Sequence, residues 1–132
     1  DVSEKGFTRD GLGILLTDSK KATGSDQERW TGKATDKPAE ETLPEEINAT
    51  QEYRQQGFDN KTTTDDHGMH IFGIAKDQNG KKYYMVKNSW GLTGKYKGIW
   101  YVSEAFVRGK SMDIMINKEA LPKDLAKKLG LK

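Results

Sequence analysis

The chain has 132 residues, a formal net charge of +2 and no cysteine. The absence of cysteine excludes disulfide bonds, thiolate metal ligands and a thiol nucleophile within these residues. No apolar run approaches the roughly 20 residues that a membrane-spanning helix needs, and the length suits one domain with a modest hydrophobic core.

The first part of the chain combines a short apolar run with a long polar stretch. Residues 12–16 are apolar apart from one glycine, whereas residues 19–46 are polar and contain two prolines. This composition predicts a surface insertion or arm at about 19–46 that packs little core of its own. Thr50 then provides an N-cap for a helix from residue 51 to about 58.

A hairpin is the next predicted element. Residues 69–75 are almost continuously apolar, which predicts a strand that is buried on both faces. Asn79 and Gly80 predict a type I′ turn, and the chain then returns as a strand over residues 82–87.

The last third of the chain adds shorter elements. Residues 98–102 are rich in aromatic and β-branched side chains, and residues 112–116 alternate, so both segments predict strands. Ser103 can cap one helical turn, and residues 122–129 predict a short amphipathic helix that ends at Gly130.

Together these elements predict an α+β fold for residues 1–132, with an antiparallel sheet and short flanking helices. Partial closure of the sheet into a β-barrel is expected, because several predicted strands are apolar on both sides.

The C-terminal segment is basic, with seven basic and three acidic side chains in residues 107–132. A basic segment can indicate nucleic-acid binding. Here the lysines alternate with leucines at helical spacing and no aromatic residue is interleaved. A solvated helix face is therefore favoured, and no nucleic-acid partner is expected.

Two side chains combine into a candidate catalytic pair. His67 lies where a polar loop enters the first hairpin strand, a rigid position with one open side that suits a general base. Asn88 ends the returning strand, so the hairpin brings it to the same end of the sheet as His67. Its amide can accept a hydrogen bond from the imidazole and fix the tautomer, and Trp90 can shield that bond from water. Such a base lacks only a nucleophile, as in Cys-His-Asn triads.

The two motifs around these residues resemble those of the papain-like cysteine peptidases, and more closely those of the bleomycin hydrolase/aminopeptidase C branch. The likeness is strongest from about residue 47 to residue 116. It is carried by His67-Gly68-Met69-x-x-x-Gly73, Asn88-Ser89-Trp90-Gly91 and Gly94-Lys95-Tyr96-Lys97-Gly98.

The resemblance implies the C-terminal lobe of a two-lobed fold, whose helical N-terminal lobe carries the cysteine and is absent from this chain. It implies that His67 is the catalytic acid and base, that Asn88 orients it and that Trp90 covers their bond. Asp66, directly before His67, is expected to stabilise the imidazolium of a thiolate–imidazolium pair. The chain alone is expected to be inactive.

The same resemblance implies an aminopeptidase as the parent protein, without a metal or another cofactor. The implied partners are the cysteine-bearing lobe and peptide substrates, with no membrane partner. A homo-oligomer is expected because members of this branch form hexamers. The same resemblance implies a cytoplasmic location; a secreted or periplasmic location would require a removed N-terminal signal.

Two alternatives remain at this point. The missing cysteine also fits a peptidase-like module that lost its nucleophile and only binds peptides or a protein partner. Asp65, His67 and His70 could instead hold a metal, although residues three apart in a strand point to opposite faces. His70 is expected to be a hydrogen-bonded packing residue.

Overall fold

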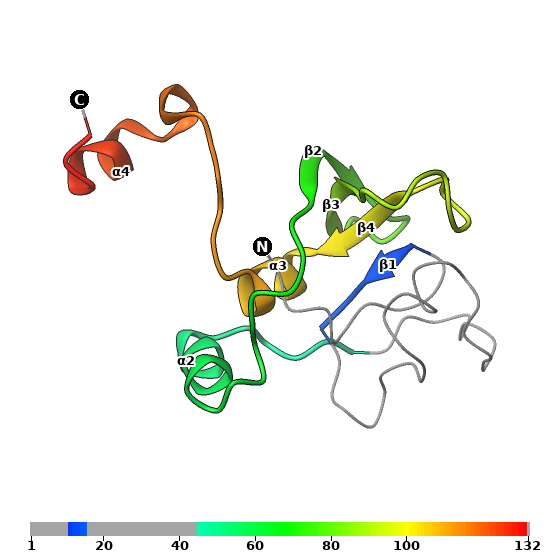
Figure 1. Ribbon diagram of the computed structural model, residues 1–132, viewed down its shortest axis with the longest axis horizontal. Coiled ribbons are helices and arrows are strands. Elements are labelled where there is room, and N and C mark those ends of the chain that lie inside the picture. The colour runs from blue at the N-terminus through cyan, green and yellow to red at the C-terminus, as the bar shows by residue number, and fades with distance from the viewer. Residues whose placement is uncertain (1–10, 16–44, 132) are drawn as a thin grey trace.

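The computed structural model describes residues 11–15 and 45–131 (Figure 1). The insertion predicted at 19–46 therefore lies almost wholly outside the described residues. In chain order the elements are β1 (Leu12–Gly13), α2 (Gln51–Asp59), β2 (His70–Lys76), β3 (Lys82–Lys87), β4 (Ile99–Ser103), α3 (Glu104–Lys110), the 3-10 helix η2 (Lys118–Ala120) and α4 (Lys123–Lys128).

The four strands form one sheet in the order β1-β4-β3-β2, flanked by short helices (Figure 1). The β2–β3 and β3–β4 pairs are antiparallel, whereas β1 runs parallel to β4. This confirms the α+β class. The predicted partial closure into a barrel is wrong for the described sheet, because β1 and β2 lie at opposite edges and do not pair. A barrel needs its two edge strands to meet.

Strand β2 lies one residue later than the strand predicted at residues 69–75, and it lacks the predicted burial. Ile71 is 44 % exposed and Ile74 is 69 % exposed, so the prediction of a strand buried on both faces is wrong. The reason is its place in the sheet: β2 is an edge strand that pairs only with β3. An apolar sequence shows that burial of the strand would be favourable. Burial also requires another element to pack over the strand.

The connection between β2 and β3 is a hairpin, but its turn lies one residue earlier than predicted. Gly80 N donates to Asp77 O at 3.0 Å, so the turn is centred on Gln78 and Asn79. Of these positions only Gly80, with φ +80°, has a positive φ. A type I′ turn needs a positive φ at both central residues, so that prediction is wrong. Asp77 Oδ1 accepts from Asn79 N and Lys81 N, which stabilises the observed turn.

The main hydrophobic core lies where the sheet meets α3 and the segment before α2. Leu15 and Phe106 are wholly buried there. Helix α3 begins at Ser103, whose hydroxyl accepts from Phe106 N as an N-cap. The buried members of this core are Leu15, Ala49, Val86, Trp100, Val102 and Phe106.

Glu46 connects three parts of this core. Its Oε1 atom accepts from Leu15 N at 2.8 Å and from the Ser103 hydroxyl. Its Oε2 atom pairs with Lys81 Nζ in the β2–β3 hairpin. One carboxylate thus joins the end of β1, the start of α3 and the hairpin.

The chain after α3 extends away from the sheet towards α4 (Figure 1). The strand predicted at residues 112–116 is wrong, since these residues form no strand and Met115 is 100 % exposed. A strand requires a partner, and no described strand lies beside this segment in the sheet. The helix predicted at residues 122–129 is confirmed as α4. Among the described residues, no helix has the length and apolarity to cross a membrane.

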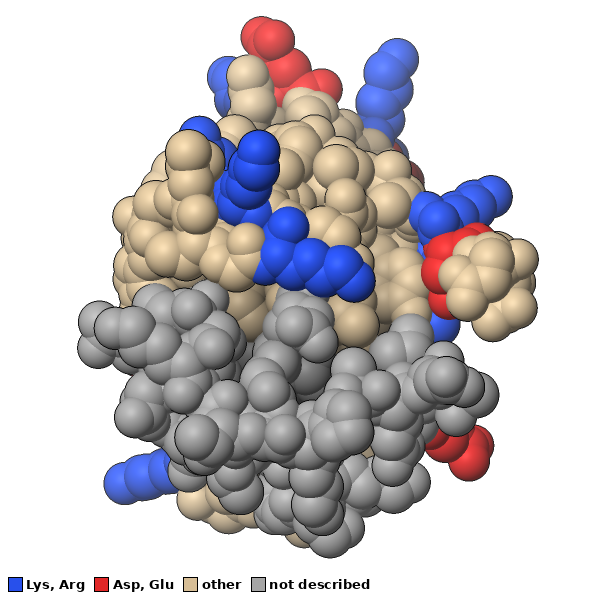
Figure 2. Space-filling view, turned by 90° about the vertical axis from the view of Figure 1, so that its right-hand side faces the viewer, with Lys and Arg blue, Asp and Glu red and all other residues tan. Residues whose placement is uncertain are grey.

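Charged side chains are dispersed over the part of the surface that Figure 2 shows. Some lysine and arginine side chains lie next to one another near the middle of the view, others project singly from its edges, and acidic side chains lie at the edges of the same face. The described part of this face therefore carries no continuous basic surface.

Candidate functional site

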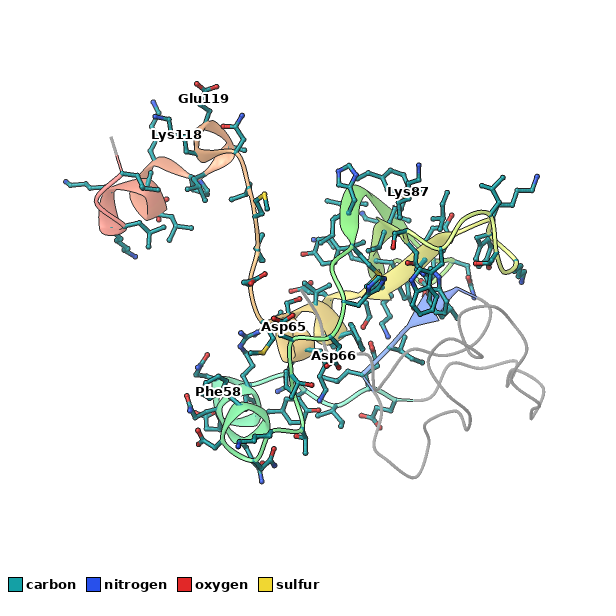
Figure 3. All side chains as sticks on the ribbon, in the orientation of Figure 1. Phe58, Asp65, Asp66, Lys87, Lys118 and Glu119 are labelled. Atoms are coloured by element: carbon teal, nitrogen blue, oxygen red, sulfur yellow. The ribbon has the colours of Figure 1, made fainter. Side chains whose placement is uncertain are left out.

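His67 lies on the irregular segment that leads from α2 to β2, and it is partly buried. Figure 3 labels Asp65 and Asp66 on this segment, and they directly precede His67 in the sequence. The beginning of the segment is fixed to the end of α2, because Thr62 N and Thr63 N both donate to Gly57 O at 3.0 Å. Its other end is fixed by β2, which pairs with β3 from His70 onward.

Asn88 directly follows β3 and is only 4 % exposed. The register of the hairpin pairs His70 with Lys87, so the residues before β2 and after β3 lie at the same end of the sheet. Asn88 N donates to Gly98 O at 3.1 Å, which fixes the backbone at this point. The result is a distance of 2.9 Å between His67 Nε2 and Asn88 Oδ1.

The chemistry of this pair determines where the imidazole proton lies. An amide oxygen only accepts hydrogen bonds, so Nε2 carries the proton and donates it to Asn88 Oδ1. In a neutral imidazole the other nitrogen, Nδ1, is then the one that can accept a proton. The structure therefore holds His67 in the tautomer that a base acting through Nδ1 requires.

Trp90 lies beside the imidazole. The ring centroids of His67 and Trp90 are 5.2 Å apart, with an angle of 39° between the planes. Trp90 itself is 36 % exposed. The indole thus covers one side of the His67 ring and presents its own outer edge to solvent.

The remaining predicted site residues lie at the surface. Asp66 is exposed, and its Oδ1 atom accepts from the Thr64 hydroxyl at 2.7 Å. His70 is exposed at the start of β2, so the prediction that it is a packing residue is wrong. Asp65 is exposed as well. No group of three or more potential metal ligands occurs in the part of the chain that the structure describes.

The loop after Asn88 is fixed by a close backbone contact that the sequence did not predict. A Cβ atom at Gly98 would lie 2.2 Å from Gly91 O, and the φ of Gly98 is +83°. Gly98 N also donates to Thr93 O at 2.6 Å. Like the role of Gly98, the buried hydroxyl of Thr93 was not predicted. A threonine within a glycine-rich segment gives no indication that its hydroxyl is buried.

Comparison with known proteins identifies the family of the chain. The profile of the family described as "Peptidase C1-like family" matches residues 41–131, which is more than half of the chain and includes both His67 and Asn88. A 33-residue segment is 48 % identical to "Cathepsin L1" of Drosophila melanogaster. That segment is 25 % of this chain and only 9 % of the Drosophila protein, so this chain covers a small part of that relative. From the extent of the family match, the chain belongs to the Peptidase C1-like family.

Proposed function

We propose that this chain is the part of a papain-like cysteine peptidase that supplies the catalytic base. In this proposal His67 is the acid and base, Asn88 orients it, and a cysteine-bearing lobe of the same parent protein supplies the thiol. The 2.9 Å contact between His67 Nε2 and Asn88 Oδ1 carries the proposal. Membership of the Peptidase C1-like family supports the class of reaction.

The proposed mechanism uses the two imidazole nitrogens separately. Nδ1 of His67 takes the proton of the thiol, and the thiolate attacks the carbonyl carbon of the peptide bond. The imidazolium then returns this proton to the leaving amine. Throughout, Nε2–H remains bonded to Asn88 Oδ1, so the ring keeps its orientation. Trp90 limits the access of water to one side of the ring, which strengthens that bond.

The finer assignment is an aminopeptidase of the bleomycin hydrolase/aminopeptidase C type, without a metal or cofactor. It rests on the motif around His67 and on the Asn88-Ser89-Trp90-Gly91 motif. The partners in this proposal are the cysteine-bearing lobe, peptide substrates and further copies of the parent protein.

The test is hydrolysis by the complete parent protein, or by this chain combined with the separately produced cysteine-bearing lobe. Substrates with a free amino terminus and their N-acetylated counterparts are compared. An aminopeptidase cleaves only the free form. His67→Ala is expected to lower kcat/KM by about 10²-fold or more, whereas the matched variant His70→Ala, at an exposed position, leaves it unchanged. Equal activity of wild type and His67→Ala would contradict the catalytic assignment.

One observation favours a second candidate, a non-catalytic module that binds peptides or a protein partner: the chain contains no cysteine. The parent reading frame separates the two candidates. A cysteine at a helix start, with a glutamine shortly before it, supports the peptidase. Ser, Ala or Gly in place of that cysteine supports the binding module.

A further inference from the structure

The Asn88 side chain is satisfied at one end only. Its Oδ1 atom accepts the bond from His67 Nε2, whereas its Nδ2 atom is buried and has no hydrogen-bond partner among the described residues. Native structures pair nearly all buried N–H groups with protein atoms or with ordered water, because an unpaired one is destabilising. The Nδ2 end of Asn88 therefore indicates a polar contact that the mechanism above does not include.

Thr93 carries the other buried side-chain atom of this kind in residues 11–15 and 45–131, its hydroxyl oxygen Oγ1. The backbone of Gly98 connects the two residues. Asn88 N donates to Gly98 O at 3.1 Å, and Gly98 N donates to Thr93 O at 2.6 Å. Gly98 also lies so near Gly91 O that a Cβ atom built on it would be 2.2 Å away. Asn88 and Thr93 are thus both hydrogen-bonded to the backbone of the same residue, Gly98.

The two atoms are chemically complementary. An amide nitrogen only donates, whereas a hydroxyl both donates and accepts. A single buried water can accept from Nδ2 and bond to Oγ1, which is how internal waters satisfy buried polar atoms. We propose that Thr93 is a positioning residue, which holds the Asn88 amide through one buried water and so keeps Oδ1 directed at His67.

The consequence concerns the tautomer of His67. The two ends of an amide have nearly the same shape, so their hydrogen-bond partners decide which end faces the imidazole. A reversed Asn88 amide would present an N–H group to Nε2. The imidazole proton would then move to Nδ1, the nitrogen that the proposed peptidase uses as its base. The catalytic meaning of Thr93 rests on that proposed function, whereas the tautomer is a property of this chain alone.

The experiment measures the tautomer by long-range proton–nitrogen correlation NMR on the ¹⁵N-labelled chain. A pH of about 8.5 is used, where an ordinary imidazole with a pKa of about 6.5 is neutral. Wild type and Thr93→Ser, which keeps the hydroxyl, are expected to hold the Nε2–H form. Thr93→Val keeps the branched shape and is expected to lower the ratio of Nε2–H to Nδ1–H about tenfold, the effect of one hydrogen bond. The exposed His70 serves as the internal reference.

An unchanged ratio in a folded Thr93→Val variant would overturn the proposal. A second measurement needs no variant: nuclear Overhauser effects from the Asn88 side-chain amide protons. A cross-peak to a long-lived bound water supports the proposal, and cross-peaks to protein protons alone overturn it. Neither readout uses peptidase activity, so a failure of the proposed function would leave both results interpretable.

Discussion

His67 Nε2 and Asn88 Oδ1 lie 2.9 Å apart, although 21 residues separate them in the chain. The β2–β3 register produces this contact, because pairing of His70 with Lys87 brings the residues outside the hairpin to one end. Most of the geometry of the His67–Asn88 pair is therefore set within a single hairpin. In the proposed peptidase, the part that supplies the nucleophile docks against a base that is already oriented.

Among the glycines of the loop after Asn88, Gly98 is predicted to cause the largest loss of stability when it is replaced by alanine. Gly98→Ala places a Cβ atom 2.2 Å from Gly91 O and is expected to lower the free energy of unfolding by about 3 kcal/mol or more. Gly80→Ala is the matched control: its φ is +80°, but a Cβ there meets no atom within 4 Å. The control substitution should lower the free energy of unfolding by only about 1–2 kcal/mol. Urea unfolding measures both variants, and equal losses would refute the role of the close contact.

Glu46 is predicted to stabilise the fold through its charge. Glu46→Gln keeps the shape but weakens three interactions, with Leu15 N, the Ser103 hydroxyl and Lys81 Nζ. The expected decrease in the free energy of unfolding is about 2 kcal/mol, because hydrogen bonds to a charged and little-exposed carboxylate are strong. Glu104→Gln breaks only an exposed pair with Arg108 and should cost less than about 0.5 kcal/mol. Thermal unfolding compares the two, and a similar loss in both would argue against the role of Glu46.

Tyr83 is predicted to make stability depend on pH in the alkaline range. Burial, together with the negative charges of Asp77 and Glu46, raises the pKa of Tyr83 from its ordinary value of 10.0 to about 12. The unfolded chain therefore loses this proton at lower pH than the folded chain does. The contribution to stability is complete below pH 10 and is lost as the pH rises through about 12.

Unfolding at a series of pH values between 9 and 12 measures this effect of Tyr83, with ultraviolet absorbance reporting phenolate formation. Tyr83→Phe should show a shallower loss of stability over this range than wild type. Identical pH profiles for the two proteins would exclude Tyr83 as the cause.

The exposed apolar side chains of β2 predict self-association of the isolated chain. Ile74 is 69 % exposed on an edge strand, and such strands offer unpaired backbone groups to a second chain. Ile74→Lys should shift the sedimentation coefficient towards the monomer at high concentration. Leu92→Lys is the control, because Leu92 is 82 % exposed but lies in a loop. A strictly monomeric wild type, or equal effects of the two substitutions, would contradict this interpretation.

Local signals were sufficient for several elements. Thr50 caps α2 as predicted, and its hydroxyl accepts from Tyr53 N at 3.2 Å. The strand predicted at residues 82–87 is β3 without a change in its bounds. The placement of His67 beside Asn88 also followed from the sequence, because a short hairpin determines which residues lie at its open end.

Features that depend on distant partners could not be predicted. The apolar pattern of β2 gave no indication of which element, if any, would cover it. Residues 112–116 alternate as a strand would, but they form no strand because no described strand lies beside them. Glu46, the last residue of a polar stretch, became a buried carboxylate because Leu15 and Ser103 meet there. The hydroxyl of Thr93 is buried only because the loop closes tightly around Gly98.

The most direct test of the proposed function is the rate at which iodoacetamide alkylates the cysteine of the assembled parent protein. Because only a thiolate reacts rapidly, the rate at about pH 6 reports whether His67 has taken the proton of the thiol. We predict that His67→Ala slows alkylation by tenfold or more and that Asn88→Ala slows it to a smaller extent. His70→Ala should react like wild type. Equal rates for wild type and His67→Ala would contradict the assignment of His67 as the base of a cysteine peptidase.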